Sequence, residues 1–161
     1  MKVRDISLLA VIAALYAALV IVLAPISFGP VQLRVADCLI PLSAILGWPA
    51  ILGVALGALI SNAYYWLGPL DVILGPVANL IAASLIFFLR KRLFIACLAG
   101  SIAVGVIVGS YLWVYFPPPE FGVVSLPLWA GMVLSITISS IIAIAVIGYA
   151  LLKALISYGF R

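Results

Sequence analysis

The stretch "LGPLDVILGPVANLIAASLIFFLRKR" (residues 67–92) contains an apolar run that ends in three consecutive basic residues. Between Asp71 and Arg90 no side chain carries a formal charge. A run of about 20 apolar residues is long enough to cross the hydrocarbon core of a bilayer as a helix. Basic residues that flank such a helix stay on the cytoplasmic side. The stretch therefore predicts a transmembrane helix whose Arg90–Arg92 end faces the cytoplasm.

The rest of the chain has the same apolar character. Of its 161 residues, 68% are hydrophobic and 7% are charged, and the mean hydropathy is +1.46. Soluble domains carry about 25% charged residues, so this chain has too little polar surface to cover a water-exposed globule. We expect an all-α integral membrane protein that crosses the cell membrane several times, with residues 1–161 forming a single membrane-embedded domain.

The basic residues predict the number of crossings. Apart from Arg34, they form three groups, at residues 2–4, 90–92 and 153–161. If all three groups are cytoplasmic, an even number of crossings separates each pair. The first interval has room for four helices of about 20 residues and the second for two. We therefore expect six transmembrane helices, with the N- and C-termini in the cytoplasm.

The second of these six helices, at about residues 35–46, is the least regular. It is short for a span and contains Pro41. A proline inside a helix removes a backbone donor and bends the helix. We expect this helix to be tilted or to begin inside a folded loop.

The remaining ionisable residues fall in the loops that the count places outside the cell: Arg34, Asp37, Asp71 and Glu120. Each taken alone is consistent with an ordinary water-exposed loop. Arg34 and Asp37 could form a surface ion pair, which contributes at most about 1 kcal/mol. Around a ligand, a guanidinium complements a carbonyl or ring nitrogen, and a carboxylate complements two N–H donors. Aromatic residues gather near the same face, as in an interfacial belt: Tyr64, Tyr65, Trp66, Tyr111, Trp113 and Tyr115.

The helix after residue 68 carries Asp71, Gly75 and Asn79 at positions i, i+4 and i+8. These positions share one helical face, and Asn79 lies about 12 Å deeper than Asp71. An acidic group, a gap at Gly75 and an amide would suit a small planar molecule with donors along one edge. Alternatively, Asp71 caps the helix and Asn79 bonds to a neighbouring helix.

The first helix has two rows of alanines at four-residue spacing. Small residues at this spacing let a second helix approach closely in lipid. The ordinary interpretation is packing within the chain, but the length of the pattern makes this helix the better candidate for contact with a partner protein. The rows consist of Ala10, Ala14 and Ala18, and of Ala13 and Ala17.

Several kinds of chemistry are missing from the sequence. It has no histidine and no GxxxxGK[ST] phosphate-binding loop, so any ATP hydrolysis requires another subunit. Cys38 and Cys97 are isolated, and we expect them to pack as small apolar residues. Nothing resembles a nucleophile–base pair or a metal cluster. We therefore expect no enzymatic activity, no cofactor and no metal, and no nucleic-acid partner.

Three segments together resemble the queuosine-precursor transporter family, whose members are substrate-binding S-components of energy-coupling factor (ECF) transporters. They are "LAPISFGPVQLRVADCLIPL" (23–42), "GVALGALISN" (53–62) and the stretch at 67–92. The resemblance implies an S-component-like fold that binds a 7-deazapurine-type substrate near the outer face. It also implies that the alanine face of the first helix docks onto a membrane coupling subunit driven by two cytoplasmic ATPases.

The resemblance carries over to the substrate site residue by residue. Arg34, Asn62, Asp71 and Gly75 match the family pattern, whereas Asp37 replaces a glutamate. Asn79 stands where the family usually has a small hydroxyl residue. The family also has an acidic residue in its last helix, where this chain offers Ser135, Thr137, Ser139 and Ser140.

Three other functions remain open from the sequence. The chain could be a stand-alone secondary transporter, although such proteins often show internal repeats and intramembrane ionisable residues. It could be an S-component for another small aromatic, vitamin-like solute. It could also be an assembly subunit without a ligand.

Overall fold

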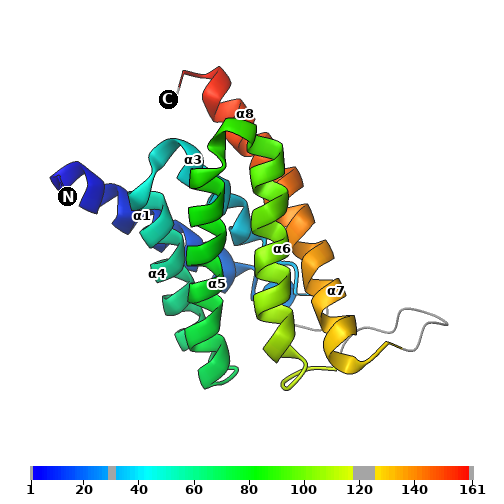
Figure 1. The fold of residues 1–161 in the computed structure, drawn as a ribbon. Coiled ribbons are helices and arrows are strands. Elements are labelled where there is room, and N and C mark those ends of the chain that lie inside the picture. The colour runs from blue at the N-terminus through cyan, green and yellow to red at the C-terminus, as the bar shows by residue number, and fades with distance from the viewer. Residues whose placement is uncertain (1, 29–31, 118–125, 160–161) are drawn as a thin grey trace.

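The computed structural model describes residues 2–28, 32–117 and 126–159, and all the regular structure in these ranges is helical (Figure 1). Glu120, which was predicted near the outer face, lies outside them. The elements, in chain order, are α1 (Val3–Val22), α2 (Ala24–Ser27), η1 (Val35–Leu42), α3 (Ser43–Leu46), α4 (Trp48–Tyr65), α5 (Pro69–Phe88), η2 (Arg90–Arg92), α6 (Leu93–Leu112), α7 (Leu128–Ser140), η3 (Ile141–Gly148) and α8 (Tyr149–Ser157).

Within the described ranges, five helical segments are long and apolar enough to cross a membrane. They are Val3–Val22, Trp48–Tyr65, Pro69–Phe88, Arg90–Leu112 and Leu128–Ser157. This confirms the prediction of an all-α, multi-pass membrane protein. The remaining predicted crossing, the second in chain order, corresponds to the short apolar segment Val35–Leu46, so six full spans and the orientation of the termini remain predictions.

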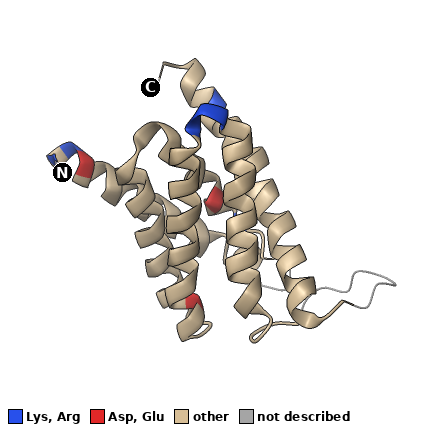
Figure 2. Cartoon of the chain, viewed as in Figure 1, with Lys and Arg blue, Asp and Glu red and all other residues tan. Residues whose placement is uncertain are grey.

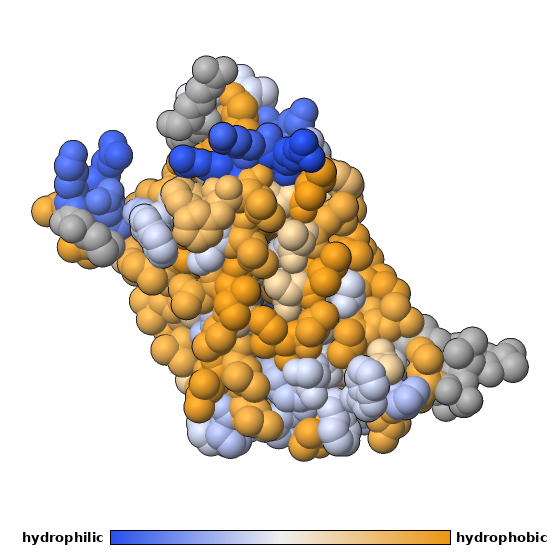
Figure 3. Space-filling view, viewed as in Figure 1, coloured by the Kyte–Doolittle hydropathy of each residue, from blue (hydrophilic) through white to orange (hydrophobic). Residues whose placement is uncertain are grey.

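Helices α4, α5, α6 and α7 lie side by side (Figure 1). The α4–α5 connection, the end of α6 and the start of α7 lie at one end of the bundle, whereas α3, η2 and α8 lie at the other. One group of lysines and arginines lies at this second end and another at the N-terminal end of α1 (Figure 2), whereas Arg34 is buried inside the bundle. An apolar belt separates the second end from the opposite end (Figure 3). A positively charged end that follows an apolar belt is the pattern that the positive-inside rule associates with a cytoplasmic face.

The bundle is packed through small residues. A Cβ atom at Gly53 would lie 2.9 Å from the Cβ of Ile12, and one at Gly57 would lie 2.7 Å from the carbonyl oxygen of Ala13. Large side chains such as Val11 and Leu15 instead face outward. Lipid tails are as apolar as leucine, so close helix approach through small residues stabilises a membrane bundle better than burial of large side chains does. This explains how α1 and α4 pack together.

Segment Val35–Leu46 is enclosed by protein. Residues 36–44 are all buried, and the close approach of η1 to the last helix depends on Gly148, where a Cβ atom would lie 2.9 Å from the carbonyl oxygen of Cys38. Pro41 lies inside η1, the eight-residue 3₁₀ helix that begins this segment. The irregularity expected from Pro41 is therefore present. A short, irregular helix is tolerated at membrane depth when protein surrounds it.

The last span changes its winding halfway along. Residues 141–148 form a π-helix, η3, between α7 and α8. At the junction, the hydroxyl of Ser101 on α6 donates a hydrogen bond to the carbonyl oxygen of Ser140 at 3.2 Å. Side chains commonly satisfy backbone groups that an irregular turn leaves free. Because π-helical turns are frequent at functional sites, the position of η3 beside η1 is relevant to the site described next.

Candidate functional site

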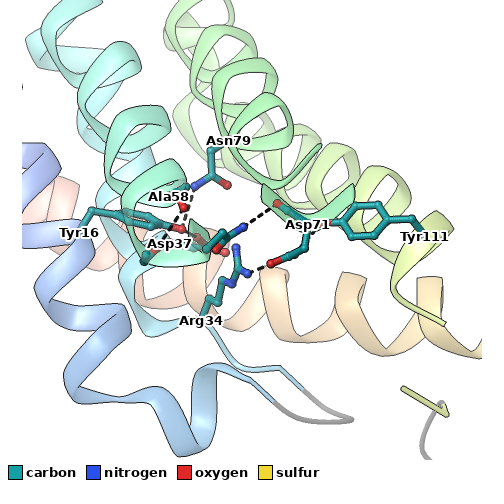
Figure 4. A network of polar contacts seen from close by, with 9 residues as sticks. Tyr16, Arg34, Asp37, Ala58, Asp71, Asn79 and Tyr111 are labelled. Atoms are coloured by element: carbon teal, nitrogen blue, oxygen red, sulfur yellow. Dashed lines mark hydrogen bonds and ion pairs between the residues drawn. The ribbon is translucent and has the colours of Figure 1, made fainter. Parts of the chain in front are cut away.

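The site is a group of polar side chains buried inside the apolar bundle. Arg34 is 7% exposed, Asp37 is 3% exposed and Asp71 is fully buried. Charges are almost never buried to this degree unless they are paired or bind a ligand. The polar residues come from different parts of the chain and meet between α1, η1, α4, α5 and α6 (Figure 4).

Arg34 pairs with Asp71 and not with Asp37. Its Nη2 atom lies 3.7 Å from Oδ1 of Asp71, and the ring of Phe28 lies 5.5 Å from its guanidinium carbon. The hydroxyl of Tyr111, on α6, donates a hydrogen bond to the same Oδ1 at 2.9 Å. Of the two alternatives left open for Arg34 and Asp37, the surface ion pair is therefore wrong. Because residues 32–37 turn tightly, the Arg34 side chain reaches α5.

The structure also rejects the interpretation of Asp71 as a helix cap. α5 begins after Gly68, and no side chain forms a capping hydrogen bond. The carboxylate lies in the first turn, where the helix dipole favours a negative charge, but it points toward Tyr111 and Arg34. The geometry thus makes Asp71 part of the buried polar group.

Tyr16 connects α1 to the site. Its hydroxyl donates a hydrogen bond to Oδ1 of Asp37 at 2.5 Å and accepts one from Nδ2 of Asn79 at 2.8 Å. Tyr16 is fully buried. Asn79 forms a hydrogen bond to the neighbouring helix α1, as the alternative interpretation predicted. The acceptor is the Tyr16 hydroxyl, which also donates a hydrogen bond to Asp37. One side chain therefore joins α1, η1 and α5.

The gap expected at Gly75 is filled by Asn62. A Cβ atom at Gly75 would clash with the amide nitrogen of Asn62. That nitrogen donates a hydrogen bond to the carbonyl oxygen of Asp71 at 2.8 Å, and Asn62 is fully buried. Because Gly75 has no side chain, the Asn62 amide can contact the backbone of α5. Gly75 therefore does not line an open space.

A small cavity borders Arg34 and Asp37. Its volume is about 10 Å³, room for about one water molecule, and its polar lining also includes Gln32. The other side is formed by α6 and α7, through Val104, Val108, Ile136 and Ser140. Of the hydroxyl residues noted on the last helix, Ser140 therefore borders the site directly. Any ligand larger than water requires the walls of this cavity to move apart.

Several buried polar atoms around this site have no hydrogen-bond partner among the described residues. Five of them belong to four side chains: the Arg34–Asp71 pair and the neighbouring Gln32 and Asn62. Buried polar groups in proteins are nearly always hydrogen-bonded, and each unsatisfied one costs about 1–3 kcal/mol. Unsatisfied groups that converge in one place indicate a binding site. These atoms are Nε2 of Gln32, Nε and Nη2 of Arg34, Oδ1 of Asn62 and Oδ2 of Asp71.

Sequence reasoning missed Tyr16, Gln32 and the hydroxyl role of Tyr111. Tyr16 lies inside an alanine-rich apolar helix, where no local pattern distinguishes a buried tyrosine from an interfacial one. Gln32 had a usable signal, since it is a lone amide two residues before Arg34 in the quoted loop. Tyr111 was expected in an aromatic belt, whereas the more typical belt residues Tyr64 and Trp66 are the exposed ones.

The two alanine rows of α1 have different environments. Ala13 and Ala17 are buried, and Ala13 faces Gly57 of α4. Ala10, Ala14 and Ala18 are exposed. Of the two rows, the one formed by Ala10, Ala14 and Ala18 is exposed to a partner protein, whereas Ala13 and Ala17 are buried and cannot be part of the predicted partner surface.

Neither a metal site nor a disulfide occurs in the part of the chain that the structure describes. No group of three or more cysteine, aspartate or glutamate side chains gathers there. Cys38 and Cys97 are free thiols, and both are buried, as expected for small apolar packing residues. The polar groups of the site are therefore amide, hydroxyl, guanidinium and carboxylate groups.

A multi-pass helical bundle that encloses an unsatisfied polar site, with basic residues at one end, has the features of a membrane transport protein. Comparison with known families agrees: residues 6–157 match the family described as QueT transporter. The chain belongs to the QueT transporter family. This confirms the resemblance found in the sequence.

One curated relative adds a narrower similarity. The chain is 37% identical over 95 residues to the queuosine precursor transporter QueT of Lactococcus lactis subsp. cremoris (strain MG1363). The match covers 56% of this chain and 54% of the relative, so the chain aligns with about half the length of that protein. No solved structure matches the chain significantly.

Proposed function

We propose that this protein is the substrate-binding membrane subunit of an ECF-type, ATP-driven importer, and that residues 1–161 form one substrate-binding domain. Its substrate is a queuosine precursor, a 7-deazaguanine-type base, captured from outside the cell. The observation that supports this most is the convergence of unsatisfied donors and acceptors around Arg34 and Asp71. A guanine-like base offers both a carbonyl acceptor and adjacent N–H donors, so it can satisfy both kinds of atom.

In this proposal, different residues of the site bind different groups of the base. Asp71 has one oxygen engaged by Tyr111 and one free, and the free oxygen together with Oδ1 of Asn62 accepts the N–H donors of the base. Arg34 donates to its carbonyl. Asp37 and Asn79, held together by Tyr16, border the site on the α1 side, and Gly75 keeps Asn62 in place.

The proposed energy coupling rests on the basic end of the bundle, the exposed alanine row of α1 and the missing phosphate-binding loop. With the basic end in the cytoplasm, the polar site opens toward the outside through the loops at the opposite end. The chain has no phosphate-binding loop, which is consistent with the arrangement that the family resemblance implies, in which two partner ATPases supply the energy through a membrane coupling subunit. The exposed row of Ala10, Ala14 and Ala18 is the surface that this subunit contacts, because small residues allow close helix approach.

Ligand-dependent thermal stabilisation of the purified protein tests the substrate. A ligand at 100 times its Kd stabilises the folded state by about 2.7 kcal/mol. We expect 7-deazaguanine-type bases to raise the Tm of the wild type and to have little effect on Asp71→Asn. The matched control is Asp5→Asn, which changes an acidic residue at the N-terminal end of α1. If no deazapurine raises the Tm while another vitamin does, the substrate assignment is wrong.

A stand-alone, ion-coupled transporter is the second candidate. The observation that favours it is the burial of Asp37 and Asp71 inside the bundle, since buried intramembrane carboxylates often carry coupling ions or protons. Proteoliposomes that contain only this chain separate the two functions. Uptake driven by a proton or sodium gradient without partner subunits or ATP would establish the second candidate and exclude the first.

A further inference from the structure

Gln32 begins the tight segment that delivers Arg34 and Asp37 to the cavity. Its backbone has a φ of +37°, a left-handed value that side-chain-bearing residues rarely adopt. Two short backbone hydrogen bonds follow, from the N–H of Arg34 to the carbonyl of Gln32 and from that of Val35 to the carbonyl of Leu33, both at 3.1 Å. Glycine would adopt this conformation without strain. A strained residue in a ligand site indicates that its side chain is needed there.

The Gln32 side chain lies in the cavity beside Arg34. Gln32 is 4% exposed, lines the cavity, and has no partner for its Nε2 donor. Nε and Nη2 of Arg34 are also buried donors without a hydrogen bond. Three unsatisfied N–H groups from two residues therefore border one small space.

Arg34 cannot easily turn away to find other acceptors. On one side, Nη2 of Arg34 lies 3.7 Å from Oδ1 of Asp71. The guanidinium carbon also lies 5.5 Å from the centre of the Phe28 ring. Asp37 and Ser140 also line the cavity, but neither forms a hydrogen bond with these donors, and Asp37 accepts one from Tyr16 instead. The rest of the opposite wall is apolar, at Val104, Val108 and Ile136. A ligand acceptor placed in this space would satisfy the donors.

We propose that Gln32 is a specificity-determining residue of the transport site, which donates a hydrogen bond, together with Arg34, to a carbonyl or other acceptor edge of the ligand. The inference rests on the proposed function and refines it. A ligand that presents an amino group at this edge places donor against donor, and it leaves the Gln32 and Arg34 groups unsatisfied. Rejection of this kind is strong in buried sites that are built to hydrogen-bond their ligand.

Two matched ligands test the proposal. 7-Deazaguanine carries a carbonyl and an N–H on its six-membered ring, whereas 2,6-diamino-7-deazapurine has an amino group and a bare nitrogen at the same positions. We expect wild-type protein to bind 7-deazaguanine at least ten times more tightly, as measured by titration calorimetry of the purified protein. Gln32→Glu replaces the donor by an acceptor of the same shape, and it should reduce this ratio at least tenfold.

Two further variants keep the test independent of folding. Gln32→Met removes the donor while keeping the length of the side chain, so it should weaken 7-deazaguanine binding about tenfold and leave 2,6-diamino-7-deazapurine binding unchanged. Ser110→Ala, at an exposed site on α6, should behave as wild type. The Tm of each variant shows that it is folded.

The outcomes are distinguishable. Equal binding of the two ligands by wild type, or an unchanged ratio in both Gln32→Glu and Gln32→Met, overturns the role of Gln32 while the deazapurine site stands. If the wild type binds neither ligand, the proposed substrate fails, and the inference about Gln32 fails with it.

Discussion

On α1, Ala13 and Ala17 lie against α4, whereas Ala10, Ala14 and Ala18 face outward. The two rows have the same composition and the same spacing. The buried row belongs to the face that carries Tyr16 into the polar site, and the outer row touches nothing within the described chain that would require small side chains. The comparison shows that a stripe of small residues indicates a place where another helix can pack closely. The stripe alone does not show whether that helix belongs to the same chain or to a partner protein.

The two faces also differ in what a substitution should disturb. A change on the inner face alters the packing of α1 on α4 and, through Tyr16, the position of Asp37 and Asn79. A change on the outer face alters only the surface that contacts the membrane or a partner protein. Three substitutions separate these effects.

The largest loss of stability is expected from Gly57→Val, on the α4 side of the inner interface. A Cβ atom there would lie 2.7 Å from the carbonyl oxygen of Ala13 and 2.7 Å from Cβ of Tyr16. The Ala13 contact is backbone, so α1 itself must shift. Overpacking of this kind costs about 3 kcal/mol. We expect a lower Tm in detergent and weaker ligand binding, whereas Leu56→Val, on the outer side of α4, should change neither. A wild-type Tm for Gly57→Val would contradict the described α1–α4 contact.

A smaller loss is expected from Tyr16→Phe. The substitution removes the hydroxyl that Asp37 and Asn79 share, and it leaves a buried acceptor and a buried donor unsatisfied. The cost is about 1–3 kcal/mol, measured by thermal unfolding. Tyr64→Phe is the control, because Tyr64 is 69% exposed. Combining Tyr16→Phe with Asp37→Asn should cost less than the sum of the two single changes, since both act on one hydrogen bond. Strict additivity would show that the two groups are independent.

The smallest effect on stability is expected from Ala14→Leu, on the outer row. Exposed substitutions usually change the free energy of unfolding by less than about 0.5 kcal/mol. We expect the Tm and ligand binding to stay at wild-type values, while uptake in cells is lost because the proposed coupling subunit can no longer approach. Val106→Leu, on the exposed side of α6, should retain uptake. If Ala14→Leu lost ligand binding as well, the outer row would serve internal packing.

Much of the architecture follows from the sequence. The predicted helices correspond to α1, α4, α5, α6 and the span from α7 to α8, since long apolar runs between polar or proline-containing loops have few other solutions in a bilayer. The irregularity at residues 35–46 was predicted from Pro41 and the short length. What the sequence did not show is that this segment is enclosed by protein, because apolar side chains suit a lipid environment and a buried one equally.

The site was predicted less completely. Arg34, Asp37, Asn62, Asp71 and Asn79 do lie together, and the signal was that polar residues are rare in this chain. Their partners were not predictable. Arg34 pairs across the bundle with Asp71 and not with Asp37 three residues away, and Gly75 admits Asn62 instead of leaving a gap.

By itself, the sequence determined that this chain is a helical membrane protein, where its spans begin and end, and which few residues are too polar to face lipid. The reason is that bilayer thickness and the need to satisfy every backbone group act on each segment separately. Only the tertiary structure decided which alanines face outward, which carboxylate pairs with Arg34, and that Tyr16 and Gln32 belong to the site. Those features depend on which helix faces meet across the bundle, and residues far apart in the chain set them jointly.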